Sequence, residues 1–256
     1  MNPFKCVQFI LPLFAGMLLS ACGASSLSYY ESSGERISEQ QNSPRIDSIV
    51  QPYKVKMEKM MNEIIGYTDS ALTSFKPESP LSNFIADVIF ETGFQFAQNN
   101  KLAPILSDFF CLLNFGGIRT SLNQGDITRG DIFEIIPFDN TIVILEIKPD
   151  KMTDLMMYLD TMAGQPVSHI HFNLSDTLHR FEIQHELVDN QSSTTSNIYV
   201  ITSDYLANGG DKMNFLTEPI HRWDTGILVR DALINWIEKN KTIPYLFGEG
   251  RIIFTP

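Results

Sequence analysis

The chain has 256 residues, of which 43% are hydrophobic and 11% aromatic, and its formal net charge at pH 7 is −11. This composition is typical of a folded domain and excludes an intrinsically disordered chain. An acidic protein without clustered Lys and Arg cannot neutralise the phosphates of a polymer, so we expect no binding to nucleic-acid polymers. The acidic net charge is still compatible with a small anionic ligand, since such a ligand needs only one or two local cations.

The N-terminal segment has the plan of a bacterial lipoprotein leader. Lys5 precedes an apolar stretch, Val7 to Leu19, that is short for a transmembrane helix, which needs about 20 apolar residues. The following Leu19-Ser20-Ala21-Cys22 resembles the lipobox, in which cleavage leaves the cysteine N-terminal and lipid-modified. We therefore predict a signal peptide at residues 1–21 and a lipid anchor on Cys22, which would hold the protein to a membrane of the cell envelope, in the periplasm or on the outer surface. An ordinary secretory leader with an incidental cysteine is the alternative.

Residues 22–48 are rich in Ser, Glu and Gln and are predicted to form a flexible tether. Such a composition buries too little apolar surface to compensate for the entropy lost on ordering. Residues 49–256 are predicted to form one domain. Its single cysteine, Cys111, lies in an apolar run and is predicted to be a buried structural thiol, because a disulfide framework lacks partners.

The hydrophobic pattern of the domain predicts helices interleaved with strands. From Val50 to Ile65 apolar side chains recur at helical spacing, which predicts a helix whose Met-rich stripe packs against the core. Further helices are expected from Pro80 to about Gln98, from Lys151 to Met162, where Asp150 is a candidate N-cap, and from Thr225 to Asn240. Strands are expected at 110–114, 141–147, 167–173, 180–188, 198–203 and 251–254. This order predicts an α+β (mixed α/β) domain in which helices pack against a mixed β-sheet.

Three segments combine tight turns with polar residues. The first, Asn114-Phe115-Gly116-Gly117-Ile118-Arg119, follows a predicted strand, and its paired glycines let the backbone approach a ligand. The second is Ile136-Pro137-Phe138-Asp139-Asn140. The third, Asp204-Tyr205-Leu206-Ala207-Asn208-Gly209-Gly210-Asp211, leads from a strand into paired glycines and an acid. Each segment alone is a weak signal, since a glycine pair after a strand is usually only a turn.

In this order the segments resemble the C-terminal domain of the 5′-nucleotidase family, which reads N-x-G-G-I-R, G-x-[IL]-[TS], P-F-x-N and F-L-A-x-G-G-D. The resemblance extends to Gly125-Asp126-Ile127-Thr128, to Glu78-Ser79-Pro80-Leu81-Ser82-Asn83 at a helix start, and to Gly250-Arg251 near the chain end. It covers about residues 49–256. The resemblance implies the mixed α/β fold of that domain and a nucleoside or nucleotide as ligand.

The resemblance also implies roles for individual side chains. The base would be sandwiched between Phe138 and Tyr205, the second standing where the family usually has Phe. Stacking suits this task because every base has a π-face. Asn114 and Asn140 would hydrogen-bond the base, and Asp211 would accept hydrogen bonds from the ribose hydroxyls. The whole expected substrate-binding set is Asn114, Gly117, Arg119, Phe138, Asn140, Tyr205 and Asp211.

Three of these residues have ordinary structural alternatives. Phe138 could belong to the core, Asp211 could be a turn residue, and Arg119, expected near the ribose and phosphate, could form a surface ion pair. Many family members carry phosphate-binding arginines just before the Glu78 motif, whereas here Lys76 is the only cation of that stretch. Lysine lacks the bidentate fork of arginine. Phosphate affinity is therefore expected to be weak or to be supplied by another chain.

The family's complete enzymes also carry an N-terminal metallophosphoesterase domain, with D-x-H and G-N-H signatures that hold two metal ions. This sequence contains neither signature. His169-Ile170-His171 could place two imidazoles on one face of a strand, but no third ligand is evident. We therefore expect no catalytic residue, no metal site and no cofactor in this chain. A divalent metal pair is expected only on a partner metallophosphoesterase.

Three functional hypotheses follow. In the first, the chain is the nucleotide-recognition half of a split 5′-nucleotidase-type hydrolase of nucleotide catabolism or salvage, and it works beside a separate metallophosphoesterase chain. In the second, it is a stand-alone lipoprotein that binds nucleosides or nucleotides for scavenging or sensing. In the third, it is a scaffold whose site has decayed, and the intact motif residues weigh against this. The preferred base and the kind of nucleotide stay open.

Overall fold

The computed structural model describes residues 43–102, 108–175, 179–183, 186–189, 197–243 and 248–255. The predicted signal peptide (1–21), Cys22 and nearly all of the predicted tether lie outside the described residues. Within the described part of the chain, no helix combines the length and the apolar character that crossing a bilayer requires.

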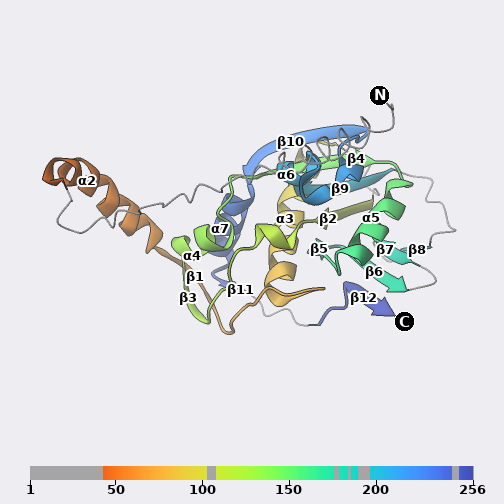
Figure 1. Cartoon of the computed structure of the whole chain (residues 1–256), viewed down its shortest axis with the longest axis horizontal. Helices are drawn as coiled ribbons and strands as arrows, with labels where there is room; N and C mark the ends of the chain where they lie inside the picture. The colour runs from red at the N-terminus through yellow and green to blue at the C-terminus, as the bar shows by residue number, and fades with distance from the viewer. Residues whose placement is uncertain are drawn as a thin grey trace, which may run out of the picture. The chain divides into compact units, whose positions relative to one another are not determined.

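Helices and strands are interleaved along the described chain, with several consecutive strands between residues 167 and 203 (Figure 1). The α-helices are α2 (Pro44–Met61), α3 (Pro80–Asn99), α4 (Arg129–Ile135), α5 (Lys151–Thr161), α6 (Asp204–Ala207) and α7 (Val229–Asn240). The strands are β1 (Ile64–Thr68), β2 (Asp108–Leu112), β3 (Gly125–Thr128), β4 (Thr141–Ile147), β5 (Val167–Ser168), β6 (Ile170–Ser175), β7 (Arg180–Ile183), β8 (Glu186–Asp189), β9 (Ile198–Ser203), β10 (His221–Leu228), β11 (Thr242–Ile243) and β12 (Ile252–Thr255).

The strands form three mixed sheets, ordered β11-β1-β3, β10-β4-β9-β2-β5 and β12-β6-β7-β8. In the five-stranded central sheet, β2 runs parallel to β9, whereas β4 pairs antiparallel with both β9 and β10. The predicted fold class, a mixed sheet packed with helices, is confirmed.

Strands β2, β4 and β9 of the central sheet are buried on both faces. Along β4, Ile142 and Ile144 face the apolar cluster that includes α3 and α7, whereas Val143 and Leu145 face the cluster that includes α5 and β6. A strand covered on both faces reads as a continuous apolar run, which explains why the sequence predicted β4 so well. Cys111 in β2 is fully buried, as predicted, and burial raises the pKa of its thiol.

Helix α3 packs closely on this sheet. It begins with Pro80 after the N-cap Ser79, whose side chain and that of Ser82 form a reciprocal capping box. Twelve of its residues are buried, which anchors the helix against the sheet. A Cβ on Gly93 would lie 2.5 Å from the side chain of Ile201, so only glycine allows this approach of helix to strand.

The first predicted helix exists, but its predicted packing is wrong. No residue of α2 is buried, and the side chains of its apolar stripe, such as Tyr53 and Met57, are exposed. Ile64 and Ile65 belong to β1 instead, and Ile65 is buried there. Helical spacing predicts an amphipathic helix, but it cannot show whether the same domain covers the apolar side.

Two further boundaries are corrected. The helix predicted from Thr225 begins only at Val229, because the preceding residues form β10 and pair with β4. Gly226 has a φ of +73°, which no right-handed helix allows. The segment predicted as one strand, 180–188, contains the two antiparallel strands β7 and β8.

Candidate functional site

The three motif segments meet at one edge of the central sheet. Because β2 and β9 are parallel, their carboxyl ends lie side by side, and β4 starts at the same edge since Ile142 pairs with Ser203. The segments 114–119 and 204–211 follow β2 and β9, and the segment 136–140 leads directly into β4. The carboxyl ends of strands are the usual position of ligand sites in parallel arrangements.

Asp211 lies at the centre of a hydrogen-bond network. It belongs to the short 3₁₀ turn η3 (Gly210–Lys212). Its Oδ2 accepts a hydrogen bond from Nδ2 of Asn114 (2.5 Å), and its Oδ1 accepts one from the Tyr205 hydroxyl (2.9 Å). Its backbone N–H donates to the same hydroxyl (3.2 Å). Neutral donors thus hold both oxygens of the carboxylate in a fixed orientation.

Two glycines leave the space that this network needs. A Cβ on Gly116 would lie 3.1 Å from Nδ2 of Asn114 and 3.3 Å from Oδ2 of Asp211, so a side chain there would crowd their hydrogen bond. A Cβ on Gly210 would lie 2.5 Å from the ring of Tyr205. The ring therefore packs directly against the backbone of Gly210, which explains why a glycine stands immediately before the acid.

Phe138 and Asn140 border a small hollow together with Asn114. Its volume is about 30 Å³, which is far below the roughly 300–1,000 Å³ of pockets that enclose a small-molecule ligand. Phe138 is 42% exposed and Tyr205 is 44% exposed, so each ring has free surface and Phe138 is not a core residue. The hollow is lined by Ile85, Leu113, Asn114, Gly117, Ile118, Ile136, Phe138, Asn140, Ser203 and Val229.

Two residues that sequence reasoning missed join the glycine loops. The side chain of Gln165, which is buried, accepts a hydrogen bond from the Phe115 N–H (2.9 Å) and donates to the hydroxyl of Tyr158 (3.1 Å). That hydroxyl donates in turn to the carbonyl of Asp211 (3.1 Å). Burial raises the pKa of Tyr158 above its ordinary value. A single Gln in a turn and one Tyr on a helix carry no periodic signal that could have shown this role.

The two cations expected near a phosphate differ in their surroundings. Arg119 is exposed, donates to the carbonyl of Gly116 (3.3 Å) and forms no ion pair with any described residue. Lys76 donates from Nζ to the carbonyl of Met162, and its Nζ lies 5.9 Å from the ring centroid of Phe115. Both side chains therefore lie beside the loop that carries Asn114.

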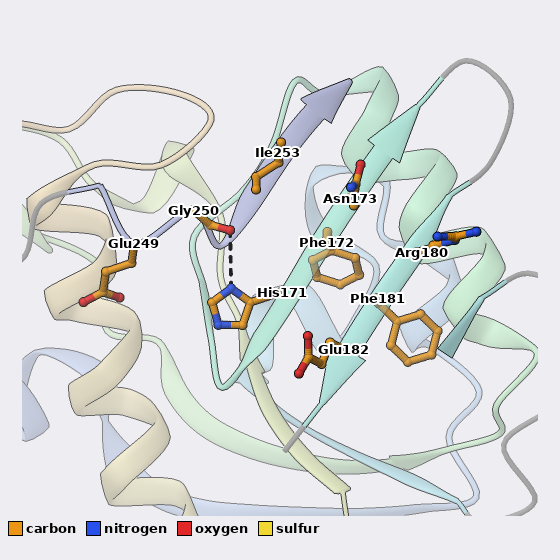
Figure 2. Close-up of a pocket in the computed structure, with 9 residues that line it drawn as sticks. All are labelled: His171, Phe172, Asn173, Arg180, Phe181, Glu182, Glu249, Gly250 and Ile253. Atoms are coloured by element: carbon orange, nitrogen blue, oxygen red, sulfur yellow. Dashed lines mark hydrogen bonds between the residues drawn. The ribbon is translucent and has the colours of Figure 1, made fainter. Parts of the chain in front are cut away.

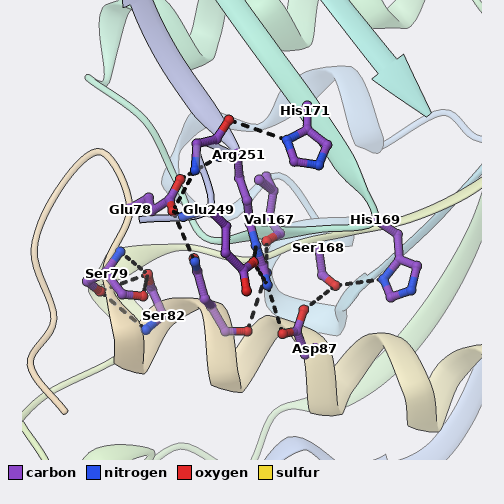
Figure 3. A network of polar contacts seen from close by, with 12 residues as sticks. Glu78, Ser79, Ser82, Asp87, Val167, Ser168, His169, His171, Glu249 and Arg251 are labelled. Atoms are coloured by element: carbon purple, nitrogen blue, oxygen red, sulfur yellow. Dashed lines mark hydrogen bonds and ion pairs between the residues drawn. The ribbon is translucent and has the colours of Figure 1, made fainter. Parts of the chain in front are cut away.

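The Glu78 motif has a structural role in this fold (Figure 3). The Glu78 carboxylate accepts hydrogen bonds from the three consecutive backbone N–H groups of residues 249–251. The buried guanidinium of Arg251 binds Asp87 of α3 and the carbonyl of Val167. These contacts fasten the chain end to α3, and none of these residues lines the hollow beside Asn114.

The two histidines of His169-Ile170-His171 do not share a strand face, which corrects the geometry considered from the sequence. His169 lies between β5 and β6 with a φ of +61°, and its ring stacks on Phe90 at a centroid distance of 3.4 Å. Burial lowers the pKa of His169. Across the described ranges, no three His, Cys, Asp or Glu side chains converge as metal ligands.

A larger hollow, of about 410 Å³, lies on the exposed side of β6 and β7, where His171, Arg180 and Glu182 line it (Figure 2). It contains none of the residues expected to bind substrate. We therefore place the candidate site at the Asp211 network, where the motif residues meet, although the hollow there is smaller.

Comparisons with known proteins agree with the motif assignment. The family model "5'-nucleotidase, C-terminal domain" matches residues 59–218. The trifunctional nucleotide phosphoesterase protein YfkN of Bacillus subtilis is 25% identical over 236 residues, which cover 84% of this chain and 16% of the relative. Human 5'-nucleotidase is 24% identical over 241 residues, which cover 83% of this chain and 40% of the relative.

Solved structures share the fold. The 5'-nucleotidase precursor from Thermus thermophilus matches with a TM-score of 0.65 at 23% identity, over 82% of this chain and 43% of that one. The NAD nucleotidase of Haemophilus influenzae matches with a TM-score of 0.60 at 16% identity, over 84% of this chain and 42% of that one. The chain thus spans less than half the length of these four proteins. Since the family model matches more than half of the chain, the chain belongs to the 5'-nucleotidase C-terminal domain family.

Proposed function

We propose that this domain binds the nucleoside part of a nucleotide at the Asp211 network and serves as the recognition half of a 5'-nucleotidase-type phosphomonoester hydrolase. The observation that carries the proposal is the Asp211 carboxylate, which two neutral donors hold in place at the sheet edge where the exposed Phe138 ring also lies. Membership of the family and relatives named as 5'-nucleotidases support it.

The chemistry of the site fits a ribonucleoside. Phe138 and Tyr205 offer free ring surface on which any base can stack. Each oxygen of the Asp211 carboxylate accepts one hydrogen bond and has a lone pair left for a ribose hydroxyl. The amide of Asn140 borders the same hollow as Phe138, where it would meet the edge of the base. Arg119 and Lys76 would lie toward the phosphate.

Hydrolysis would depend on a metal pair held outside these residues, and we propose that a metallophosphoesterase chain provides it. Helix α2 supports a partner of this kind. Its apolar side chains, including Tyr53 and Met57, are all unburied, and Pro52 interrupts its hydrogen bonding. A single helix of this sort is marginal in water, so a partner that covers its apolar side would stabilise it.

The second candidate function is a stand-alone nucleoside-binding lipoprotein. One observation favours it: Lys76, the only cation just before Glu78, already donates to the Met162 carbonyl and lacks the fork with which arginine grips phosphate. For either function we propose anchoring through Cys22 at a membrane of the cell envelope, on the strength of the lipobox resemblance. Membrane fractionation of Cys22→Ala tests the anchor, and unchanged membrane association would refute it.

Calorimetric titration with nucleosides tests the proposed site. Phe138→Ala should weaken binding by ~1–3 kcal/mol, the contribution of stacking one base on an aromatic ring. Phe254→Ala is the matched control, because Phe254 on β12 is 41% exposed and lies outside the site. It should leave the affinity unchanged.

The ribose contact is tested separately. Asp211→Asn suits the left-handed backbone at this position (φ +50°) but removes the charge and one acceptor oxygen. The wild type should bind a ribonucleoside more tightly than its 2′-deoxy analogue, and the variant should lose most of that preference. Absence of binding by any nucleoside or nucleotide at millimolar concentration would instead support a decayed site.

A further inference from the structure

The loop that carries Phe138 is attached to the first turn of α7. The backbone N–H of Val229 donates to the carbonyl of Asn140 (2.9 Å), at the point where the loop enters β4. The next residue of the helix, Arg230, points its guanidinium at the same loop. Neither the family motifs nor the periodicity of α7 singled out this arginine.

Arg230 contacts the loop at three points. Its Nη2 forms an ion pair with Oδ1 of Asp139 (2.5 Å), and its Nη1 makes longer contacts with the carbonyls of Ile136 (3.4 Å) and Phe138 (3.5 Å). On the other side, its guanidinium carbon lies 4.1 Å from the ring centroid of Phe133 in α4. A planar cation held between a ring and a loop has one orientation.

The surroundings of Arg230 argue against a purely stabilising ion pair. The arginine side chain is 8% exposed, so its charge loses most of its contact with water, whereas that of its partner Asp139 is 79% exposed. The cost of burying a charge can exceed what such a pair contributes to stability. In addition, the Nε of Arg230 is buried and has no hydrogen-bond partner among the described residues. Both terminal nitrogens of Arg230 contact the loop, whereas its Nε is left without a partner in the described part of the chain. Buried donors without a partner are rare in folded proteins, so this geometry indicates a role other than stability.

We propose that Arg230 is a positioning residue, which fixes the loop 136–140 so that the Phe138 ring is presented to the base. This inference rests on the proposed function, because it assumes that Phe138 stacks on a nucleoside. A lysine cannot replace the arginine, since one ammonium cannot reach the carboxylate and both carbonyls at once.

A double-mutant cycle tests the proposal with adenosine and uridine as probes. Arg230→Lys should lower the affinity for both at least fivefold in the wild-type background and less than twofold in the Phe138→Ala background, because the ring through which it acts is then gone. Arg251→Lys is the matched control: its arginine has a similarly buried side chain (7% exposed) but fastens the chain end. In folded protein it should leave both affinities unchanged.

A ligand-free measurement keeps the proposal testable if neither probe binds. With a single 4-fluorophenylalanine at position 138, the ¹⁹F resonance should be narrow in the parent and broadened or split by Arg230→Lys, but not by Arg251→Lys. An unchanged resonance would overturn the proposal, and so would equal losses of affinity in both backgrounds of the cycle. If Phe138→Ala itself leaves the affinity for nucleosides intact, the proposed function fails, while the ¹⁹F result still decides whether Arg230 orders the loop.

Discussion

Tyr205 shows how a single substitution within a motif changes a site. The ring that the family usually supplies as Phe is retained and exposed, while the added hydroxyl both donates to and accepts from Asp211. The resemblance predicted the aromatic ring and the acid, but not the bond between them. That bond depends on the left-handed backbone of Asp211 and on the room above Gly210, neither of which a residue pattern reveals.

The buried imidazole of His169 predicts a pH dependence of stability. Burial lowers its pKa, Arg251 lowers it further and Asp87 opposes the shift. The folded protein therefore binds fewer protons here than the unfolded chain, whose His titrates near pH 6.5. The stability from this residue is fully present above that pH and is lost as the pH falls through the lower pKa of the folded state.

His169→Asn tests this sign. Asn has no titrating group and tolerates the positive φ of this position. Urea unfolding between pH 7.5 and 5.5 should show a smaller fall in the free energy of unfolding for the variant than for the parent. If the free energy of unfolding falls equally in both proteins, the pKa of His169 is not lowered in the folded state.

Among the elements, the sequence predicted best those with a strong apolar pattern. Strand β4 occupies the predicted 141–147 because a continuous apolar run marks it, and α3 and α5 end within one residue of their predicted limits because their apolar side chains recur at helical spacing. Asp150 stands at the N-cap of α5, but its side chain makes no capping hydrogen bond. Strand β10 was missed because its side chains are mostly exposed or half-buried, so that no apolar alternation marks it.

The apolar side of α2, which no described residue buries, leads to a prediction for this element. Tyr53→Ala and Met57→Ala should each change the free energy of unfolding by less than about 0.5 kcal/mol, because neither side chain is buried. Leu81→Ala in α3 is the buried counterpart, at 1% exposure, and should cost about 2–5 kcal/mol. Chemical denaturation measures all three. A loss above about 2 kcal/mol for Met57→Ala would restore the original interpretation of α2 as a core helix.

For the whole molecule, the strand order decides where the site forms. Segments 114–119, 136–140 and 204–211 meet because β2, β9 and β4 are neighbours in the central sheet. Nothing in the chain's periodicity shows that order, so the candidate site could be predicted from the family resemblance alone. The same order brings the first turn of α7 to this edge, since β10 pairs with β4 and ends at Leu228. This is how Arg230, absent from every motif, comes to contact the loop that carries Phe138.

The last prediction concerns the proposed split of nucleotide recognition and hydrolysis between two proteins. Mixed with a single-domain metallophosphoesterase from the same source, this chain should raise kcat/KM for a nucleoside 5′-monophosphate, because the energy of binding the base and ribose positions the scissile phosphate at the metals. Phe138→Ala should remove most of that gain, by about fivefold to 150-fold if stacking contributes ~1–3 kcal/mol. Hydrolysis of p-nitrophenyl phosphate, which has no base or ribose, should hardly change.

Tyr53→Ala combined with Met57→Ala should weaken association of the two chains while nucleoside binding by this chain persists. Equal losses with both substrates would show that Phe138 acts on folding or assembly, and metal-dependent hydrolysis by this chain alone would end the split-enzyme proposal.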